Sequence, residues 1–216
     1  PSNITKTIDF LRTSMQKKIH NEKTIPENAK TTLVGLSFGG MIALQWAQLF
    51  PNEVEQLILI NTSSSRLSPL WHRISFPQLP KLLLVLSSVS VKKREKHILS
   101  LVSNNHGSDQ KVLNQWLSIQ SSSPVSLTTI IKQVLMAASF SFTAKGSVKK
   151  DTLILCSKKD RLVPYQASMA LAKALNITPI KHTHAGHDLP LDDPKWTLEK
   201  IQQFLFRHSP QSEVSF

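Results

Sequence analysis

Ser37 stands in a concentration of glycines that the rest of the chain lacks. The 216-residue sequence contains six glycines, far fewer than the average usage of about 7% would give. Gly35, Gly39 and Gly40 nevertheless fall within six positions. Glycine permits backbone angles and close approaches that other residues avoid. A serine with glycines two positions before and two positions after it is typical of a turn that presents a nucleophilic hydroxyl.

The elements that must position this serine favour the same chemistry. Residues 31–34 are β-branched and apolar and predict a buried strand. Residues 41–50 have the apolar spacing of a helix that Pro51 ends. A serine at such a strand-to-helix turn adopts strained backbone angles, and the free N–H groups of the new helix point toward it. We therefore predict that Ser37 is a nucleophile and that the Phe38 N–H stabilises a developing oxyanion.

A nucleophilic serine needs a base, and the base needs an acid that orients it. This kind of turn predicts the chain order serine, acid, histidine. Asp160 follows a second predicted buried strand at residues 151–156. His187 follows a short predicted strand at residues 179–183, with Gly186 beside it. Both loops lie at the carboxyl ends of their strands. Asp160 is the predicted acid and His187 the predicted base.

Together these segments resemble the α/β-hydrolase fold family, in particular its lidded serine esterases. The matching segments are Gly35-Leu36-Ser37-Phe38-Gly39-Gly40, Asp160-Arg161-Leu162-Val163-Pro164 and Gly186-His187. Ser157 departs from the pattern, because many members have glycine there, although serine can also start a turn. The resemblance implies covalent Ser-His-Asp cleavage of a carboxylic ester by Ser37, Asp160 and His187, with no metal and no organic cofactor.

The order of elements indicates an α/β fold, a parallel sheet with flanking helices and an inserted α-helical lid. Residues 1–61 and 151–216 are predicted to form the hydrolase core. Residues 62–150 lack the alternation of strand and helix and are predicted to form the lid. Ser123-Pro124 is expected to start one lid helix. One face of another is expected to consist of Leu79, Leu82, Leu83 and Leu86.

The chain reaches its nucleophile turn early. Members of the family that it resembles normally have four strands and a helix before the helix that follows the nucleophile, whereas Ser37 follows one predicted helix and one predicted strand. The resemblance implies that the earlier strands and a second oxyanion-hole N–H are missing, which would leave the strand at 31–34 as an uncovered edge. We expect a fragment or a truncated gene product. A weakly active or inactive hydrolase remnant is therefore an alternative.

The positive charge is concentrated in the predicted lid. The chain has a net charge of +12, and residues 61–150 hold twelve Lys and Arg against two Asp and Glu, a balance of +10. A solvated helix face is the simplest interpretation of the densest run, around Lys92, Lys93 and Arg94. The alternatives are an anionic membrane surface and an acidic acyl carrier protein. The carrier protein would deliver an acyl methyl ester that is attached to it. This is the substrate class of the methyl ester esterases of biotin synthesis, which the sequence resembles in motif order.

A histidine cluster offers a competing interpretation. His182, His184 and His187 resemble the H-x-H-x-D-H motif of metallo-β-lactamase-type hydrolases, but Gly186 stands where that motif needs aspartate. A metal-dependent hydrolase is thus a further alternative. Cys156 lies inside a predicted strand and is expected to be a core residue; one cysteine fits a reducing, cytoplasmic compartment. No nucleic-acid-binding motif is present, and no apolar run approaches the ~18 residues of a transmembrane helix.

Overall fold

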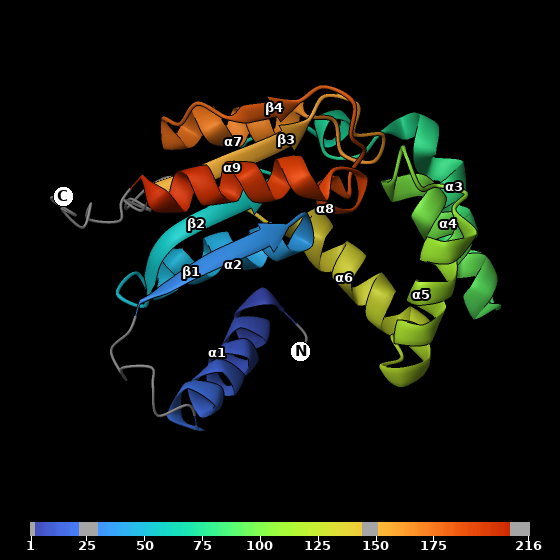
Figure 1. Ribbon diagram of the computed structural model, residues 1–216, viewed down its shortest axis with the longest axis horizontal. Helices are drawn as coiled ribbons and strands as arrows, with labels where there is room; N and C mark the ends of the chain where they lie inside the picture. The colour runs from blue at the N-terminus through green and yellow to red at the C-terminus, as the bar shows by residue number, and fades with distance from the viewer. Residues whose placement is uncertain (1–2, 22–29, 144–150, 208–216) are drawn as a thin grey trace, which may run out of the picture.

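A parallel sheet forms the centre of the molecule. The computed structural model describes residues 3–21, 30–143 and 151–207 (Figure 1). The sheet has the strand order β1-β2-β3-β4, and every neighbouring pair is parallel. The strands are β1 Thr31–Leu36, β2 Val54–Ile60, β3 Asp151–Ser157 and β4 Ile180–His182. The structure confirms the predicted α/β class, and each predicted strand lies within two residues of its observed bounds.

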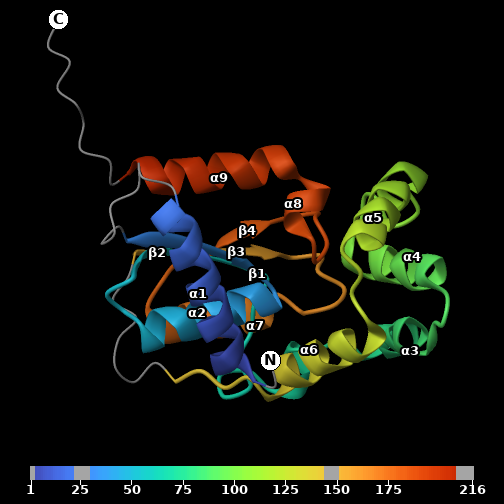
Figure 2. The same cartoon turned by 90° about the horizontal axis from the view of Figure 1, so that it is seen from below.

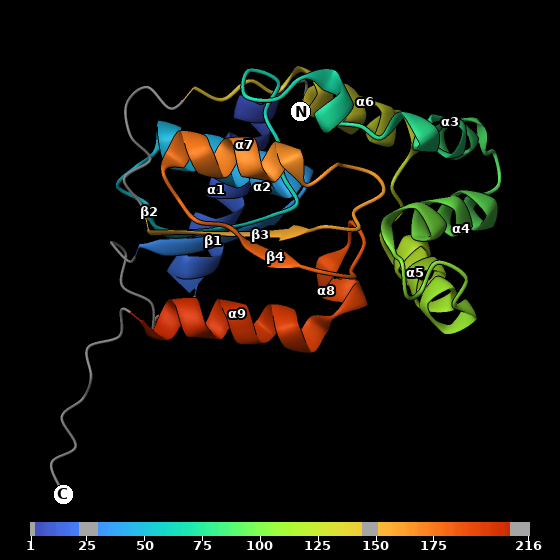
Figure 3. The ribbon, with the colours of Figure 1, turned by 90° about the horizontal axis from the view of Figure 1, so that it is seen from above.

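Helices cover both faces of this sheet. They are α1 Ile4–Asn21, α2 Phe38–Leu49, α7 Gln166–Leu175, α8 Leu189–Asp192 and α9 Pro194–Phe206. Figure 3 shows the sheet edge-on, with α2 and α7 on one side and α9 on the other. Helices α2 and α7 are the crossovers from β1 to β2 and from β3 to β4, as parallel neighbours require, and α9 follows β4 and covers the other face.

The central strands are apolar on both faces because each face is covered. Along β2, Leu57 and Leu59 point into a core shared with α1, α2 and α7. The intervening Ile58 and Ile60 point into the opposite core, which α8 and α9 close. Side chains alternate along a strand, so a strand that is covered on both faces needs an unbroken apolar run. The sequence Leu-Ile-Leu-Ile at 57–60 supplies it.

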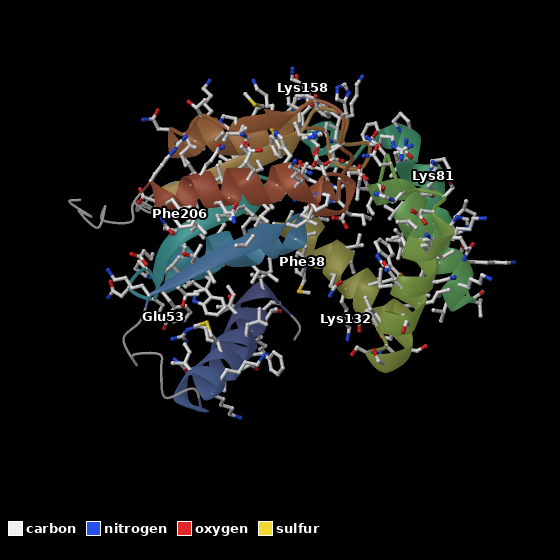
Figure 4. All side chains as sticks on the ribbon, viewed as in Figure 1. Phe38, Glu53, Lys81, Lys132, Lys158 and Phe206 are labelled. Atoms are coloured by element: carbon white, nitrogen blue, oxygen red, sulfur yellow. The ribbon has the colours of Figure 1, made fainter. Side chains whose placement is uncertain are left out.

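Helix α1 is attached to α2 and to the start of β2. Ile8 is fully buried in the core that α1 shares with α2. Arg12 forms an ion pair with Glu53, with Nε 2.9 Å from Oε2, and its guanidinium lies 3.5 Å from the centre of the Phe50 ring. Trp46 Nε1 also donates to Glu53, at 3.0 Å. Figure 4 shows Glu53 at the end of β1 away from the predicted nucleophile turn.

Strand β1 lies at an edge of the sheet. Over the described residues it pairs with β2 alone. Val34 is 57% exposed, although it sits in the middle of an apolar strand. Figure 2 shows α1 crossing in front of β1 and α2. An exposed apolar edge of this kind is the arrangement that the sequence analysis expected for residues 31–34.

Residues 62–143, which we call the helical insertion, contain helices and no strand. The α-helices are α3 Leu79–Ser87, α4 Val91–Val102, α5 Gln110–Ser122 and α6 Leu127–Ser139, preceded by short 3₁₀ turns at Leu70–His72 and Phe76–Gln78. Figure 1 shows them gathered beyond the end of the sheet toward which β1 points. The predicted lid extends to residue 150, but residues 144–150 lie outside the described part, so its boundaries remain a prediction. In the described residues, no helix is both long and apolar enough to cross a bilayer.

Two predictions within the insertion need correction. Helix α6 begins at Leu127 rather than at Ser123-Pro124, because Ser126 accepts a hydrogen bond from the Thr129 N–H at 3.1 Å and caps the first turn. The expected leucine face of α3 is packed only in part, since Leu82 and Leu86 are half-buried. Leu83 is 65% exposed, whereas Val85 is buried. Periodicity in so short an apolar helix does not identify the inward side.

Candidate active site

Ser37 occupies a strained turn between β1 and α2. Its φ and ψ are 53° and −116°, a conformation that non-glycine residues rarely adopt. The turn is held on both sides, since the Ser37 N–H donates to Ile60 O at 2.8 Å and Thr62 Oγ1 donates to Ser37 O at 2.7 Å. Two contacts from the end of β2 and the residues after it therefore fix the backbone that carries the predicted nucleophile.

The glycines around Ser37 have unequal roles. A Cβ on Gly35 would lie 2.5 Å from backbone atoms of Gly39 and Gly40, and a Cβ on Gly40 would lie 2.8 Å from Thr62 Cβ. Both positions therefore require glycine. A Cβ on Gly39 would meet no atom within 4 Å. Crowding therefore does not require glycine at position 39, and the close approach at this turn is between Gly35 and the start of α2.

Phe38 is the first residue of α2, so its N–H has no acceptor within the helix. Figure 4 shows Phe38 near the end of β1, on the side of the sheet that meets α6. The N-terminus of a twelve-residue helix also carries a partial positive charge. The Phe38 N–H is thus placed beside the Ser37 hydroxyl at a point where negative charge is favoured.

Asp160 lies in the loop after β3 with its side chain completely buried. Its Oδ1 accepts hydrogen bonds from the N–H groups of Leu162 and Val163, both at 2.8 Å. Its Oδ2 accepts a hydrogen bond from His187 Nδ1 at 2.7 Å. Because the backbone holds one oxygen, the other is fixed in direction. The structure brings the predicted acid and the predicted base together.

His187 is also buried, with 5% of its side chain exposed. Burial by itself would lower the pKa of His187. The charge of Asp160, the hydrogen bond that His187 donates to Asp160 and the charge of Asp188 outweigh burial, so the pKa of His187 is raised above its ordinary value. A histidine whose Nδ1 donates to a carboxylate presents Nε2 as the free basic atom. This is the tautomer that a general base for a serine hydroxyl requires.

One polar residue outside the predicted site, Asn61, holds the histidine loop. Asn61, which follows β2 with a φ of 46°, donates from Nδ2 to His187 O at 2.8 Å. Its Oδ1 accepts the N–H of Ser157, the residue that departs from the family pattern, at 2.8 Å. The available signal was a polar residue directly after a buried strand, of the type that tolerates a positive φ. Nothing in the sequence indicates which loop it would hold.

The predicted catalytic residues follow the carboxyl ends of the strands, at the same end of the sheet. The register pairs Leu36 with Ile60 and Ile60 with Leu155, so β1 and β2 end at the same level, and it pairs Ser157 with His182, so β3 and β4 end together two residues further on. Ser37 follows the first strand and His187 the last. Over the described residues, Ser37 Oγ makes no hydrogen bond. Catalytic hydrogen bonds are often long without substrate and tighten when the substrate binds.

A cavity of about 290 Å³ opens beside Ser37. Its wall joins the nucleophile turn, the Asp160 loop and the helical insertion. The lining residues are Ser37, Phe38, Met41, Ser63, Leu70, Arg73, Ile74, Leu82, Ile130, Gln133, Val134, Ala137, Ala138, Leu162 and Val163. Arg73 is the one charged residue among them, and its Nη1 and Nη2 donate to Ala138 O and Ala137 O at 2.8 and 2.6 Å. The cavity therefore suits an apolar group next to a nucleophile.

The competing residues have other surroundings. His182 Nε2 lies 3.2 Å from Asp193 Oδ2, and His182 Nδ1 accepts the N–H of Ala185 at 2.8 Å. Among the described residues, no group of three or more His, Cys, Asp or Glu side chains is arranged to hold a metal ion. Burial raises the pKa of the Cys156 thiol to about 11, as expected for a core cysteine within β3.

The basic run on α4 is divided between surface and interior. Lys92 and Lys93 are exposed, but Arg94 is 5% exposed and lies 3.8 Å from Glu95. Arg94 therefore does not belong to a basic docking surface, which corrects the expectation that the three residues act together. Every third or fourth residue of a packed helix turns inward, and on α4 this places Arg94 on the same side as Leu101.

Comparison with known proteins agrees with this architecture. Residues 10–194 match the model of a family described as alpha/beta hydrolase fold. No curated protein sequence matches the chain. Three solved structures are similar in fold: a hydrolase from Pseudomonas aeruginosa PA01 (TM-score 0.72, 15% identity), a candidate lipase from Acinetobacter baumannii AYE (0.64, 20%) and a candidate aryl esterase from Burkholderia cenocepacia (0.63, 21%).

These alignments cover 95%, 96% and 82% of this chain and 72%, 68% and 64% of the respective structures. Identities this low establish the fold alone, but the family model matches most of the chain. The strained serine turn, the parallel strand order and the flanking helices all agree with that match. The chain therefore belongs to the alpha/beta hydrolase fold family, and hydrolase is its enzyme class.

Proposed function

We propose that this hydrolase cleaves carboxylic esters through a covalent acyl-enzyme on Ser37, with His187 as general base and Asp160 as its orienting acid. The observation that carries the proposal is the 2.7 Å hydrogen bond between two buried side chains, His187 Nδ1 and Asp160 Oδ2. That bond leaves Nε2 as the basic atom of His187. Ser37 is held in a strained turn at the same carboxyl end of the sheet.

In the first half of the reaction, Ser37 Oγ attacks the ester carbonyl carbon and its proton passes to His187 Nε2. The carbonyl oxygen becomes an oxyanion, for which the Phe38 N–H at the start of α2 is a donor. The C–O bond to the alcohol then breaks, and His187 returns the proton to the leaving oxygen. Asp160 keeps its charge throughout and stabilises the imidazolium.

In the second half, a water molecule gives a proton to His187 Nε2 and attacks the acyl-Ser37 carbonyl. Collapse of the second oxyanion releases the carboxylic acid and returns the proton to Ser37 Oγ. Each proton taken from a nucleophile is returned to a leaving group, so the cycle consumes only the ester and one water molecule. Asn61 and Thr62 contribute indirectly, because they hold the backbone of His187 and of Ser37.

The size of the cavity predicts a compact acyl group. Its 290 Å³ is at the lower end of the range of about 300–1,000 Å³ for ligand pockets. A mostly apolar lining favours an unbranched or aromatic acyl group over a charged one. In a series of p-nitrophenyl esters, kcat/KM is expected to rise over the shorter chains and to fall once the acyl group exceeds the cavity.

The decisive experiment is the substitution Ser37→Ala. Ester hydrolysis is expected to fall by at least about 10⁴-fold, the loss seen when a nucleophilic serine is removed. A fluorophosphonate is expected to label the wild-type chain at Ser37 and to leave the variant unlabelled. Labelling elsewhere, or activity that a chelator removes and Ser37→Ala does not, would contradict the proposal. A wild-type chain that never labels would support the inactive-remnant alternative.

A further inference from the structure

Asp192 is a buried carboxylate five positions after His187, at the end of α8. Its side chain accepts four hydrogen bonds. Oδ1 receives the hydroxyl of Ser103 and the N–H of Asn105 at 3.2 Å, and Oδ2 receives the N–H groups of Gly186 at 2.6 Å and Asn104 at 2.9 Å. The residue as a whole is 7% exposed. One carboxylate thus joins the histidine loop to the segment that follows α4.

The charge of Asp192 is held by these donors alone. Over the described residues it forms no ion pair. Burial alone would raise the pKa of Asp192, but the hydrogen bonds from Ser103, Asn104, Gly186 and Asn105 together outweigh it and lower the pKa. Burying a carboxylate without a cation is costly unless several donors satisfy it. An ionised carboxyl group can accept hydrogen bonds from four donors, two at each oxygen. An asparagine in its place could accept only at its single amide oxygen, because the amide NH₂ cannot accept a hydrogen bond.

The segment 102–105 reaches both loops of the proposed active site. Val102 O accepts the N–H of Asp188 at 2.8 Å, next to His187. Asn104 Nδ2 donates to His184 O at 2.9 Å and to Lys159 O at 3.1 Å, next to Asp160. Arg161 also donates to Ser103 O at 2.7 Å. The segment therefore touches residues on both sides of the histidine and on both sides of the acid.

The fit at Gly186 is too close for a side chain. A Cβ there would lie 2.8 Å from Val102 O, 3.0 Å from the Asn104 nitrogen and 3.1 Å from Asp192 Oδ2. Gly186, the residue before the predicted base, therefore packs directly against the segment after α4, and Asp192 Oδ2 binds the N–H groups of both Gly186 and Asn104. A displacement of this contact is transmitted directly to the backbone of His187.

We propose that Asp192 is a positioning residue for His187, acting through the Gly186 N–H and the segment Ser103–Asn105. It holds the histidine loop so that the imidazole meets Asp160 on one side and faces Ser37 on the other. This role rests on the proposed function as far as catalysis is concerned. The residues at the end of α4 then help to fix the position of His187. The helical insertion would therefore contribute to catalysis in addition to lining the cavity.

The test compares Asp192→Asn with a milder variant of the same contact, Ser103→Ala, and with one control, Asp109→Ala. Ser103→Ala removes one of the four donors and keeps the carboxylate. Asp109→Ala removes the side chain that caps α5 through the Lys111 N–H at 2.8 Å and that pairs with His106 Nδ1 at 3.1 Å. The substitution destabilises the insertion without touching either catalytic loop. Each variant is measured for thermal stability, for the number of sites that a fluorophosphonate titrates, and for kcat and KM per titrated site.

Asp192→Asn is expected to lower kcat per titrated site by about 10- to 100-fold, the loss that follows from a misplaced catalytic group, with KM changed by less than about twofold. Ser103→Ala should lower kcat in the same direction by a smaller factor. Asp109→Ala should leave kcat per site unchanged. If Asp192→Asn reduces only the number of titrated sites or the melting temperature, Asp192 stabilises the fold and does not position the base.

A second readout does not depend on turnover. The proton between His187 Nδ1 and Asp160 is expected to give a low-field proton resonance in the wild type, identified by its loss in Asp160→Asn. In Asp192→Asn the resonance should broaden or disappear, and in Asp109→Ala it should persist. A resonance unchanged in Asp192→Asn would overturn the positioning role. A wild type that does not label at Ser37 would refute the proposed function, and the resonance would still decide the role of Asp192.

Discussion

Ser37 and His187 follow strands at opposite sides of the same sheet, and they are held in place in different ways. The Ser37 turn depends on local backbone geometry: a positive φ, a glycine that cannot carry a side chain, and the start of a helix within a few residues. The His187 loop depends on side chains distant in the sequence: Asn61 binds His187 O, Asn104 binds His184 O, and Ser103 binds Asp192. The first arrangement is local and steric, whereas the second is long-range and made of hydrogen bonds.

This difference predicts how each region fails when it is changed. A steric clash in a close-packed turn cannot be relieved by a small movement, so a single methyl group should destroy the nucleophile turn. A loop held by several hydrogen bonds should loosen by degrees as the bonds are removed one at a time. The predictions below test this contrast, from the largest expected effect to the smallest.

Gly35→Ala is expected to abolish activity. The new Cβ would lie 2.5 Å from the backbone of Gly39 and Gly40, and overpacking against backbone typically costs about 1–3 kcal/mol or more. The matched control is Gly39→Ala, whose Cβ meets no atom within 4 Å and which lies in the first turn of α2, where alanine favours the helix by up to about 1 kcal/mol.

Chemical denaturation of both variants measures the contrast. Gly35→Ala should be less stable than the wild type and should not label with a fluorophosphonate. Gly39→Ala should be as stable as the wild type or more so. Equal losses at the two positions would mean that the turn needs glycines for a reason other than the contact between Gly35 and α2.

Asn61→Ala is expected to weaken the histidine side by a smaller amount. The substitution leaves the Ser157 N–H and the His187 carbonyl without their partner inside the protein, and each unsatisfied buried group costs about 1–3 kcal/mol. Alanine also tolerates the φ of 46° poorly. Asn61→Gly separates the two contributions, because glycine accepts the backbone angle but does not restore the hydrogen bonds.

Both variants at position 61 should lower kcat per titrated site by roughly tenfold, since the loop shifts without losing its chemistry. Denaturation and active-site titration are the measurements. If Asn61→Gly recovers wild-type stability and turnover, then the backbone angle and not the amide is what the loop needs, and the contrast between steric and hydrogen-bonded support is weaker than we state.

The same contrast explains which parts of the molecule could be predicted from sequence. The strand, the glycines and the serine of the nucleophile turn stand within ten residues, so their pattern is visible in the sequence. Asp160 and His187 were predicted because each follows a recognisable strand and matches a motif of the family. Asn61, Ser103 and Asp192 were not assigned to the site, because their roles depend on contacts across 89 to 126 residues. The inward side of α3 was likewise decided by packing, which periodicity does not determine.

The pH dependence tests the electrostatics of the histidine side. Because the pKa of His187 is raised, the protonated, inactive form persists to higher pH, so kcat/KM should rise with pH with a midpoint above the ordinary histidine value of 6.5. The effect on stability has the opposite sign: protonated His187 stabilises the fold at pH below its unfolded pKa, and this contribution is lost as pH rises through the folded pKa.

Asp188→Asn should lower this midpoint, because it removes one of the charges that raise the pKa of His187. Asparagine can still cap α8 in place of Asp188. The pH–rate profile of kcat/KM is the measurement. A midpoint at or below 6.5 in the wild type would contradict the charge arrangement that we describe, and a midpoint unchanged in the variant would assign the shift to Asp160 alone.

Charge reversal on the outer surface of α4 should have the smallest effect. Lys92 and Lys93 are exposed on α4, and in the part of the chain that the structure describes no hydrogen bond or ion pair joins their side chains to either catalytic loop. The double substitution Lys92→Glu and Lys93→Glu should leave kcat/KM for a small neutral ester within about twofold, because solvent and salt screen exposed charges and a neutral substrate needs no electrostatic steering. An ester attached to an acidic acyl carrier protein should be cleaved more slowly by the variant at low salt, since the loss of steering lowers the association rate.

If the variant cleaves both substrates as fast as the wild type does, the carrier protein is excluded as a partner of this surface. If the variant is slower on the neutral ester as well, then the surface charge of α4 also acts on the catalytic loops, in addition to the buried contacts at the end of the helix.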